Sequence, residues 1–499
     1  MMWDTVIGIE THVQLATSSK IFSTGGTKFG NSPNSQIDYV DVGLPGVLPV
    51  LNAKAVELAV KFGIAVGGQI ANESIFARKN YFYPDLPKGY QISQFEKPIV
   101  VGGSLEIKSF DSSVFNVPLV RAHLEEDAGK SVHDGVENFF PGFSGIDLNR
   151  AGMPLLEIVT EPTLTSAQEA VAYGRTLHNL VTWIEICDGN MQEGSFRMDA
   201  NVSIKPRGAK KLGVRCEIKN LNSFRYLEKA IRYEVARQID IIESGGMVTQ
   251  QTRLFDPVKN ETREMRSKEN SDDYRYFPDP DLPPLIIESD YIEQVGSTLP
   301  ELPDHARSRL SKKWSLPDDL VMSICSKKQN LIFFEESLKY WFRLTSLKFN
   351  FDNPDEILIR RSKILANWLT GELFSILNKE NIDICESKIS PKKLSEVLIK
   401  LEDNTLSKKT AKQLFSLIWN GEKGDINKII IDKNLNKIED DSAVEDLIGE
   451  VISKNQKMVN EFRSGKEKAL NALVGQVMKK SGGRAEAKDV KEKILLLIG

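Results

Sequence analysis

Four short stretches of the sequence, residues 6–14, 121–127, 197–204 and 215–219, alternate polar and apolar residues with a period of two. Successive side chains of a β-strand point to opposite faces, so each stretch is predicted to be a strand with one polar and one apolar face. Such strands are typical of an antiparallel sheet that packs one face against a core. The pattern therefore constrains the N-terminal part of the chain to a sheet covered on its apolar side.

The polar positions of these strands carry carboxylates, imidazoles and cations. The alternation groups Glu10 with His12 and Gln14, His123 with Glu125 and Asp127, Asp199 with Arg197 and Asn201, and Glu217 with Arg215 and Lys219. Hard cations prefer oxygen ligands, and such a face is typical of a Mg²⁺–phosphate site. A solvated sheet face is polar as well, so the residues alone leave both interpretations open.

Length and charge limit the classes of function. The 499 residues exceed what one hydrophobic core supports and indicate about three domains. The formal net charge of −4 excludes a general basic field, so any nucleic-acid contact must be a local patch. The residues 1–4 do not begin a signal peptide and no window approaches 18 apolar residues, so a cytoplasmic protein without a membrane span is expected.

The four cysteines, Cys187, Cys216, Cys325 and Cys385, have no CxxC spacing. We expect reduced and mostly buried thiols, without disulfides or a zinc site. Cys216 alternates with Val214 and Ile218, which points its thiol toward the core.

The order of elements indicates an α+β fold followed by helices. Residues 1–292 are β-rich, with one helix opened by a capping box at Ser166–Glu169 and another running from near Ser223 to Gly245. Proline clusters at 277–284 and 299–303 bracket a domain boundary. Beyond it, apolar positions of helical spacing predict an all-α domain at 293–405 and an α-helical tail domain at 406–499; they include Trp341, Leu365, Trp368, Leu394 and Leu414.

Three motifs have both a functional and a structural interpretation. The segment 79–90 is dense in aromatic and basic residues; it either stacks on a nucleobase with Lys79 or Lys88 at phosphate, or is a surface loop of packed tyrosines. Arg150, beside Gly152, either clamps a phosphate or pairs with Glu157. Lys479, Lys480 and Arg484 form a cationic knob for phosphate backbones or an ordinary solvated helix end. No P-loop, GxGxxG or kinase motif is present.

Taken together, several motifs resemble the B-subunit family of the bacterial tRNA-dependent aspartyl/glutamyl amidotransferases. They occupy residues 6–12, 79–85, 91–94, 123–130, 217–224, 273–278, 366–369 and 473–478, so the resemblance spans essentially the whole chain. It implies a cradle-shaped catalytic domain with an antiparallel sheet, followed by the helical and tail domains.

The resemblance also implies an activity. The protein would use ATP and Mg²⁺ to phosphorylate the side-chain carboxylate of Glu-tRNA(Gln) or Asp-tRNA(Asn), and ammonia would then displace phosphate. An amidase A subunit would supply the ammonia, and a small C subunit would complete the heterotrimer. The competing classes are a non-catalytic RNA-binding scaffold and a self-sufficient glutamine amidotransferase; no nucleophile motif favours the latter.

Carried over by motif, the resemblance assigns the site. The metal and catalytic residues would be Glu10, His12, Glu125, Asp199 and Glu217; the nucleotide would meet Lys79, Tyr81, Arg150, Asn201 and Lys219; the tail would meet tRNA through Lys479, Lys480 and Arg484. Alternation supports Glu125 and turns Glu126 to the other face. Some members carry a Cys-rich knuckle where this chain has Ser23, Asp38 and Asp41, so no zinc is expected, and the tail loop 483–487 also departs from the family pattern.

Overall fold

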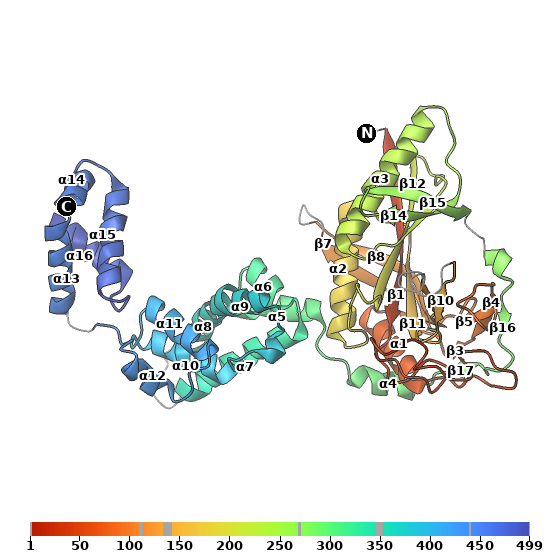
Figure 1. Cartoon of the computed structure of the whole chain (residues 1–499), viewed down its shortest axis with the longest axis horizontal. Coiled ribbons are helices and arrows are strands. Elements are labelled where there is room, and N and C mark those ends of the chain that lie inside the picture. The colour runs from red at the N-terminus through yellow and green to blue at the C-terminus, as the bar shows by residue number, and fades with distance from the viewer. Residues whose placement is uncertain are drawn as a thin grey trace. The chain divides into compact units, whose positions relative to one another are not determined.

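The structure is a computed structural model that describes residues 2–108, 113–132, 142–267, 271–345, 353–438 and 441–498. The chain forms two compact units, Met1–Pro303 and Asp304–Gly499 (Figure 1). The finer division of the second unit at residues 405 and 406 stays a prediction.

A large sheet of ten strands organises the described part of the first unit, in the order β15-β14-β13-β12-β1-β11-β8-β6-β2, with β7 paired to β8. Its strands are β1 Trp3–Gln14, β2 Gln69–Ile70, β6 Val100–Val101, β7 Ser104–Lys108, β8 Val114–Glu126, β11 Pro154–Thr160, β12 Phe196–Pro206, β13 Cys216–Lys219, β14 Gln251–Asp256 and β15 Glu261–Ser267. All four predicted strands are present. One pair departs from the expected antiparallel arrangement: β13 and β14 run parallel. A parallel pair requires a crossover connection, and helix α3 (Phe224–Glu243) provides it.

Helices cover the apolar face of the sheet. Helix α2 (Ala167–Trp183) and helix α3 lie along this face (Figure 1). Both predicted helices are confirmed, with Ser166 and Ser223 as N-caps. The capping box at Ser166 differs in one hydrogen bond. The Glu169 carboxylate accepts from the backbone amide of Thr165 (2.7 Å) in place of the backbone amide of Ser166. Beneath the helices the sheet contributes apolar side chains with no exposure, among them Ala200, Val202, Cys216 and Ile218.

Short strands flank the polar face of the sheet. They are β3 Glu73–Ser74, β4 Ala77–Asn80, β5 Tyr90–Ser93, β9 Lys130–Val132, β10 Gly145–Asp147, β16 Phe277–Pro278 and β17 Leu285–Ile286. The order β16-β4-β5 puts the proline-bearing β16 at an edge, where no amide donor is needed on its open side. This pairing brings the segment before Phe277, far along the chain, next to the start of the aromatic segment at Lys79. Helices α1 (Ala53–Ala65) and α4 (Ser289–Ser297) pack together in the same unit.

The second unit is helical. Its helices are α5 Pro303–Trp314, α6 Asp318–Ile324, α7 Lys328–Thr345, α8 Pro354–Trp368, α9 Phe374–Glu380, α10 Pro391–Glu402, α11 Lys408–Trp419, α12 Ile426–Asp432, α13 Asp441–Lys454, α14 Gln456–Arg463, α15 Glu467–Lys480 and α16 Ala487–Ile498. The predicted apolar positions Trp341, Leu365, Trp368, Leu394 and Leu414 are all buried. Helices α13 to α16 share a separate cluster of apolar side chains that includes Ile448, Leu473 and Ile494. Among the described helices of the chain, none combines the length and the hydropathy that a membrane span requires.

Candidate functional site

Strand pairing gathers the predicted polar residues on one face of the sheet. Glu10 of β1 lies opposite Asp199 of β12, and His12 lies between Arg197 of β12 and Glu157 of β11. Glu157 in turn lies opposite His123 of β8, and Asn201 opposite Glu217 of β13. Residues directly opposite each other in a ladder share a face, so the polar faces of five strands form one continuous surface.

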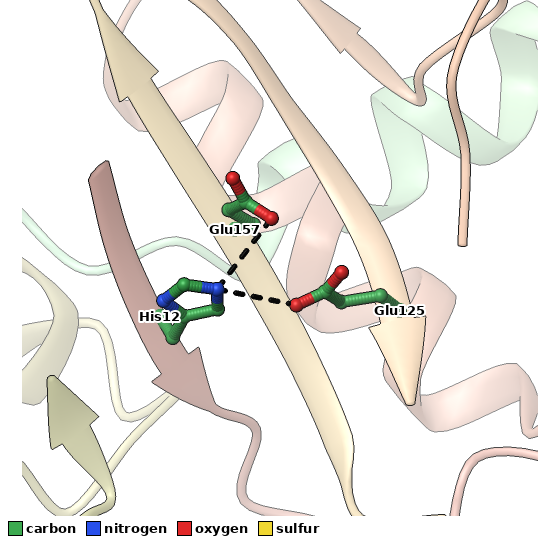
Figure 2. Close-up of side chains that lie close together, drawn as sticks. All are labelled: His12, Glu125 and Glu157. Atoms are coloured by element: carbon green, nitrogen blue, oxygen red, sulfur yellow. Dashed lines mark ion pairs between the residues drawn. The ribbon is translucent and has the colours of Figure 1, made fainter. Parts of the chain in front are cut away.

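At its centre, His12, Glu125 and Glu157 converge (Figure 2). The Nε2 atom of His12 lies 3.3 Å from Oε1 of Glu125 and 3.5 Å from Oε2 of Glu157. The imidazole of His123 approaches the same Glu157 oxygen at 3.3 Å. Burial alone would lower the pKa of His12, but the carboxylates of Glu157 and Glu125 outweigh it and raise this pKa to about 10. The cluster therefore takes up positive charge at its centre.

This cluster could hold a metal ion. His12, Glu125 and Glu157 each offer one ligand atom, and these atoms lie within 4.8 Å of one another. Two carboxylate oxygens suit a hard divalent cation such as Mg²⁺, which is usually bound by one or two carboxylates and keeps several waters. The two carboxylates that raise the pKa of His12 are the same ones that would balance the charge of a bound cation.

A second acidic cluster surrounds Lys219. The Nζ atom of Lys219 lies 2.8 Å from Oδ2 of Asp199 and 3.2 Å from Oε1 of Glu217. Burial alone would lower the pKa of Lys219, but Asp199, Glu217 and more weakly Glu10 raise it above its usual value. Glu10 also accepts a hydrogen bond from Nδ2 of Asn201 (2.8 Å). The five residues predicted as metal ligands are thus divided between two clusters on one face.

A pocket of about 310 Å³ opens between the clusters and the short strands. Its lining includes His12, Glu125, Lys79, Tyr81, Arg197 and Lys219. The ammonium of Lys79 lies 4.7 Å from the centre of the Tyr274 ring. Burial alone would lower the pKa of Lys79, whereas Tyr276, Glu125 and Glu157 raise it above its usual value. Lys79 therefore contributes a permanent positive charge to the pocket at neutral pH.

Two predicted interactions are corrected by the observed ion pairs. Arg150 does not pair with Glu157; its Nε donates to Oδ2 of Asp127 (2.7 Å), which also accepts from Arg197 (3.0 Å). Lys88 is not available for phosphate, because it forms a buried ion pair with Glu126 (2.7 Å to Oε2). Glu126 also accepts from the amide of Ile92 (2.7 Å), so it is turned away from the cluster of Figure 2, as alternation predicted.

Glu157 is the residue that the sequence did not assign to the site. It stands in the segment Pro154–Thr160, where its neighbours Leu156 and Ile158 are buried apolar residues. A lone carboxylate in an apolar central strand was the available signal, since a buried charge needs a partner. Its partners, His12 and His123, are distant in sequence and became visible only through the strand order.

The loop that follows β1 is held by hydrogen bonds to Asp41, at the place where some family members carry cysteines. The carboxylate of Asp41 accepts from the fully buried Lys20 (2.8 Å), from Ser23 Oγ (2.8 Å) and from the amide of Asp38 (2.8 Å). A buried ammonium and a carboxylate thus hold this loop together.

The predicted cationic knob of the tail is only partly free. Lys479 is exposed at the end of α15. Lys480, next to it, forms an ion pair with Glu450, and Arg484 donates to Asn434 Oδ1 (3.0 Å). Two of the three cations assigned to tRNA therefore have local partners.

The fold and the polar face define a class of protein: an α+β protein whose sheet carries a metal-type carboxylate cluster beside a cationic pocket. The sequence matches the GatB/GatE catalytic domain over residues 5–293 and the GatB domain over residues 356–498. The chain therefore belongs to the GatB family, the B subunits of the tRNA-dependent amidotransferases.

Curated relatives are similar over their full length. The B subunit of the aspartyl/glutamyl-tRNA(Asn/Gln) amidotransferase of Thioalkalivibrio sulfidiphilus is 52% identical over 492 residues, which cover 99% of this chain and 98% of the relative. The proteins of the same name from Nitrosospira multiformis and Paraburkholderia xenovorans are each 52% identical, over 513 and 500 residues; the alignments cover 99% and 98% of this chain and 98% of each relative.

Proposed function

We propose that this chain activates and amidates the side-chain carboxylate of Glu-tRNA(Gln), Asp-tRNA(Asn) or both. A carboxylate oxygen of the charged amino acid attacks the γ-phosphorus of ATP, and ADP leaves. Ammonia then attacks the carbonyl carbon of the acyl phosphate, and inorganic phosphate leaves as the C–O bond breaks. The observation that carries the proposal is the His12–Glu125–Glu157 cluster beside a cationic pocket, in a chain similar throughout to named B subunits of amidotransferases.

His12, Glu125 and Glu157 are the residues that would hold Mg²⁺. The ion would supply neutralisation of the charge that develops on the transferred phosphoryl group. The residues themselves fix its place, because β1, β8 and β11 are adjacent central strands of the sheet. His123 lies on the neighbouring strand β8, within hydrogen-bonding distance of Glu157, and orients that carboxylate.

The cations of the pocket would position the phosphates and the substrate carboxylate. Lys79 and Lys219 remain charged at neutral pH, because both pKa values are raised, so neither serves as a general base. Arg197 is fixed by Asp127 and presents the rest of its guanidinium for a planar oxyanion. Positioning and charge compensation supply most of the catalysis in phosphoryl transfer, and these side chains provide both.

Two of the four cysteines, Cys187 and Cys216, are unsuited to glutamine hydrolysis. Burial raises the pKa of Cys187 to about 12 and that of Cys216 to about 11, so both stay protonated thiols. A thiolate is the nucleophile in cysteine-dependent glutamine hydrolysis, and neither residue can supply one at neutral pH. We infer that ammonia comes from an amidase A subunit, that a small C subunit completes the complex, and that the complex works in the cytoplasm, where charged tRNAs are used.

The test is amidation by the complex reconstituted from this chain and its A and C subunits. Radiolabelled Glu-tRNA(Gln) and Asp-tRNA(Asn) are supplied separately with ATP, Mg²⁺ and glutamine, and the products are deacylated and separated. We expect amidation that requires both ATP and Mg²⁺. Glutamine hydrolysis without amidation of either tRNA would instead support a non-catalytic scaffold.

A further inference from the structure

The end of β12 and its connection to β13 are strongly basic. Residues 205–215 contain five cations, Lys205, Arg207, Lys210, Lys211 and Arg215, and no Asp or Glu. We call this segment the basic loop. It stands out in a chain whose formal net charge is −4.

The cations of the basic loop lack acidic partners. No carboxylate in the described part of the chain lies within 4.0 Å of any of the five. Three other exposed cations of the same unit are paired: Lys54 with Glu57 (2.8 Å), Lys97 with Glu73 (2.6 Å) and Arg232 with Glu228 (2.9 Å). Uncompensated like charges repel one another. Binding of an anionic partner would reduce this repulsion and stabilise the loop.

The backbone of the loop is fixed by hydrogen bonds. The amide of Arg207 donates to the carbonyl of Met2 (3.0 Å), and the amide of Gly208 donates to Oδ2 of Asp4 (3.0 Å). Gly208 has a φ of 77°, a conformation that glycine adopts without strain. At Gly213 the backbone passes so close to Ile204 that a Cβ would lie 2.0 Å from the Ile204 carbonyl oxygen. A preorganised loop loses less conformational entropy when it binds a partner.

The basic loop begins on the face that carries the candidate site. Strand alternation puts Lys205 on the same face as Asn201 and Asp199. The register agrees, since Lys205 lies opposite Asp4 and Asp199 lies opposite Glu10. Eight residues at the rise of an antiparallel strand place Lys205 about 27 Å along β12 from Arg197, which lies opposite His12. An extended anion whose end reaches His12 can thus meet these cations about 27 Å further along the sheet.

We propose that the basic loop binds the phosphate backbone of the substrate tRNA several nucleotides behind its charged 3′ end. The inference rests on the proposed function. Lysine and arginine contacts to phosphate position a nucleic acid without reading its sequence, so they suit either of the two candidate tRNAs. The exposed Leu212 and Val214 (51% and 45%) between the cations offer apolar contacts to ribose or an unstacked base.

The experiment uses the reconstituted complex and two triple variants of this chain. The loop variant carries Arg207→Gln, Lys210→Gln and Lys211→Gln; the control variant carries Lys54→Gln, Lys97→Gln and Arg232→Gln. Both remove three exposed cations from the same unit, but only the control cations have acidic partners. Net charge and the number of substitutions are therefore matched.

Binding of labelled, charged tRNA and KM for that tRNA are measured at several salt concentrations. We expect the loop variant to raise Kd and KM about ten-fold and to reduce the salt slope by about 2, as for three lost contacts to a single strand. KM for ATP and kcat should change less than two-fold, and the control variant should resemble the wild type.

Unchanged tRNA binding and salt slope in the loop variant, or an equal loss in the control, would overturn the proposal. Failure of the loop variant to assemble, seen by gel filtration, would show a protein interface instead and would also overturn it. Direct binding separates this inference from the proposed function: a wild-type complex that binds tRNA through the loop but does not amidate it refutes only the function.

Discussion

Two groups of carboxylates on the same face of the central sheet differ in what balances their charge. Asp199 and Glu217 are balanced in part from within the chain, by the ammonium of Lys219. Glu125 and Glu157 surround His12, whose pKa they raise to about 10 after outweighing its burial. The first group contains a lysine ammonium of its own, whereas the second contains a titratable imidazole in that place.

The difference shows how one polar surface can combine two tasks. A lysine fixed among carboxylates gives a permanent charge arrangement that does not depend on an added ion. A carboxylate–imidazole cluster without lysine keeps a place for an exchangeable divalent cation. The substitutions below distinguish these two arrangements, beginning with the largest expected effect.

Removing one carboxylate from the second cluster should abolish amidation. We expect Glu125→Gln and Glu157→Gln, and equally His12→Ala, to lower kcat on the order of a thousand-fold, because lost stabilisation by the metal is worth several kcal/mol. The Mg²⁺ concentration that gives half the maximal rate should rise as well. The measurement is ATP-dependent formation of Gln-tRNA by the complex over a range of Mg²⁺ concentrations.

Glutamine hydrolysis by the A subunit serves as the control and should survive in these variants. Near wild-type kcat for Glu157→Gln would show that this carboxylate is no ligand. The same result for Glu125→Gln would remove the cluster from the mechanism.

The neighbouring Glu126 should affect stability more than activity. Glu126 forms a buried ion pair with Lys88, and breaking such a pair by removing one partner costs about 3–5 kcal/mol. We expect Glu126→Gln to lower Tm clearly while kcat falls less than about five-fold at a temperature where the fold is intact. Thermal unfolding and kcat are measured on the same preparation. A kcat loss equal to that of Glu125→Gln, with Tm unchanged, would contradict the facing of the strand.

Local patterns in the sequence sufficed for the strands and their facing. Period-two alternation separated Glu125 from Glu126, and Ser166 and Ser223 marked where two helices begin, because both signals are short-range. The face of each strand could therefore be predicted without knowing its neighbours.

Pairings across the sheet were not predictable in the same way. The Glu157–His12 and Glu126–Lys88 contacts join residues that are far apart in the chain, and only the strand order β1-β11-β8 brings the first pair together. The division of the predicted ligands between two clusters depends on the same order. A contact between strands is set by the packing of the whole sheet, and a single sequence does not contain it as a local pattern.

A smaller effect should follow when a hydrogen bond to the first group, that of Asp199, Glu217 and Lys219, is removed. The hydroxyl of Thr252, a residue 1% exposed, donates to Oε2 of Glu217 (2.9 Å). Thr252→Val keeps the shape but removes this donor, and a hydrogen bond to a charged group is worth about 1.5–3 kcal/mol. We expect kcat to fall about ten-fold with little change in KM for tRNA, and Thr252→Ser to restore it. A Thr252→Ser variant as slow as Thr252→Val would indicate a packing role instead.

The smallest effect is expected at the end of α15, where Lys479 and Lys480 differ in whether they form an ion pair. Lys479 is exposed and Lys480 pairs with Glu450, so only Lys479 is available to a phosphate without first breaking an ion pair. Point substitutions suit this test better than removal of the predicted tail domain at 406–499, because Asp304–Gly499 forms one compact unit. We expect Lys479→Gln to raise KM for charged tRNA about two-fold and to reduce the salt slope by about 0.9, as for one lost contact to duplex phosphate. Lys480→Gln should leave the slope unchanged. Equal slopes for wild type and both variants would exclude this end of α15 from tRNA binding.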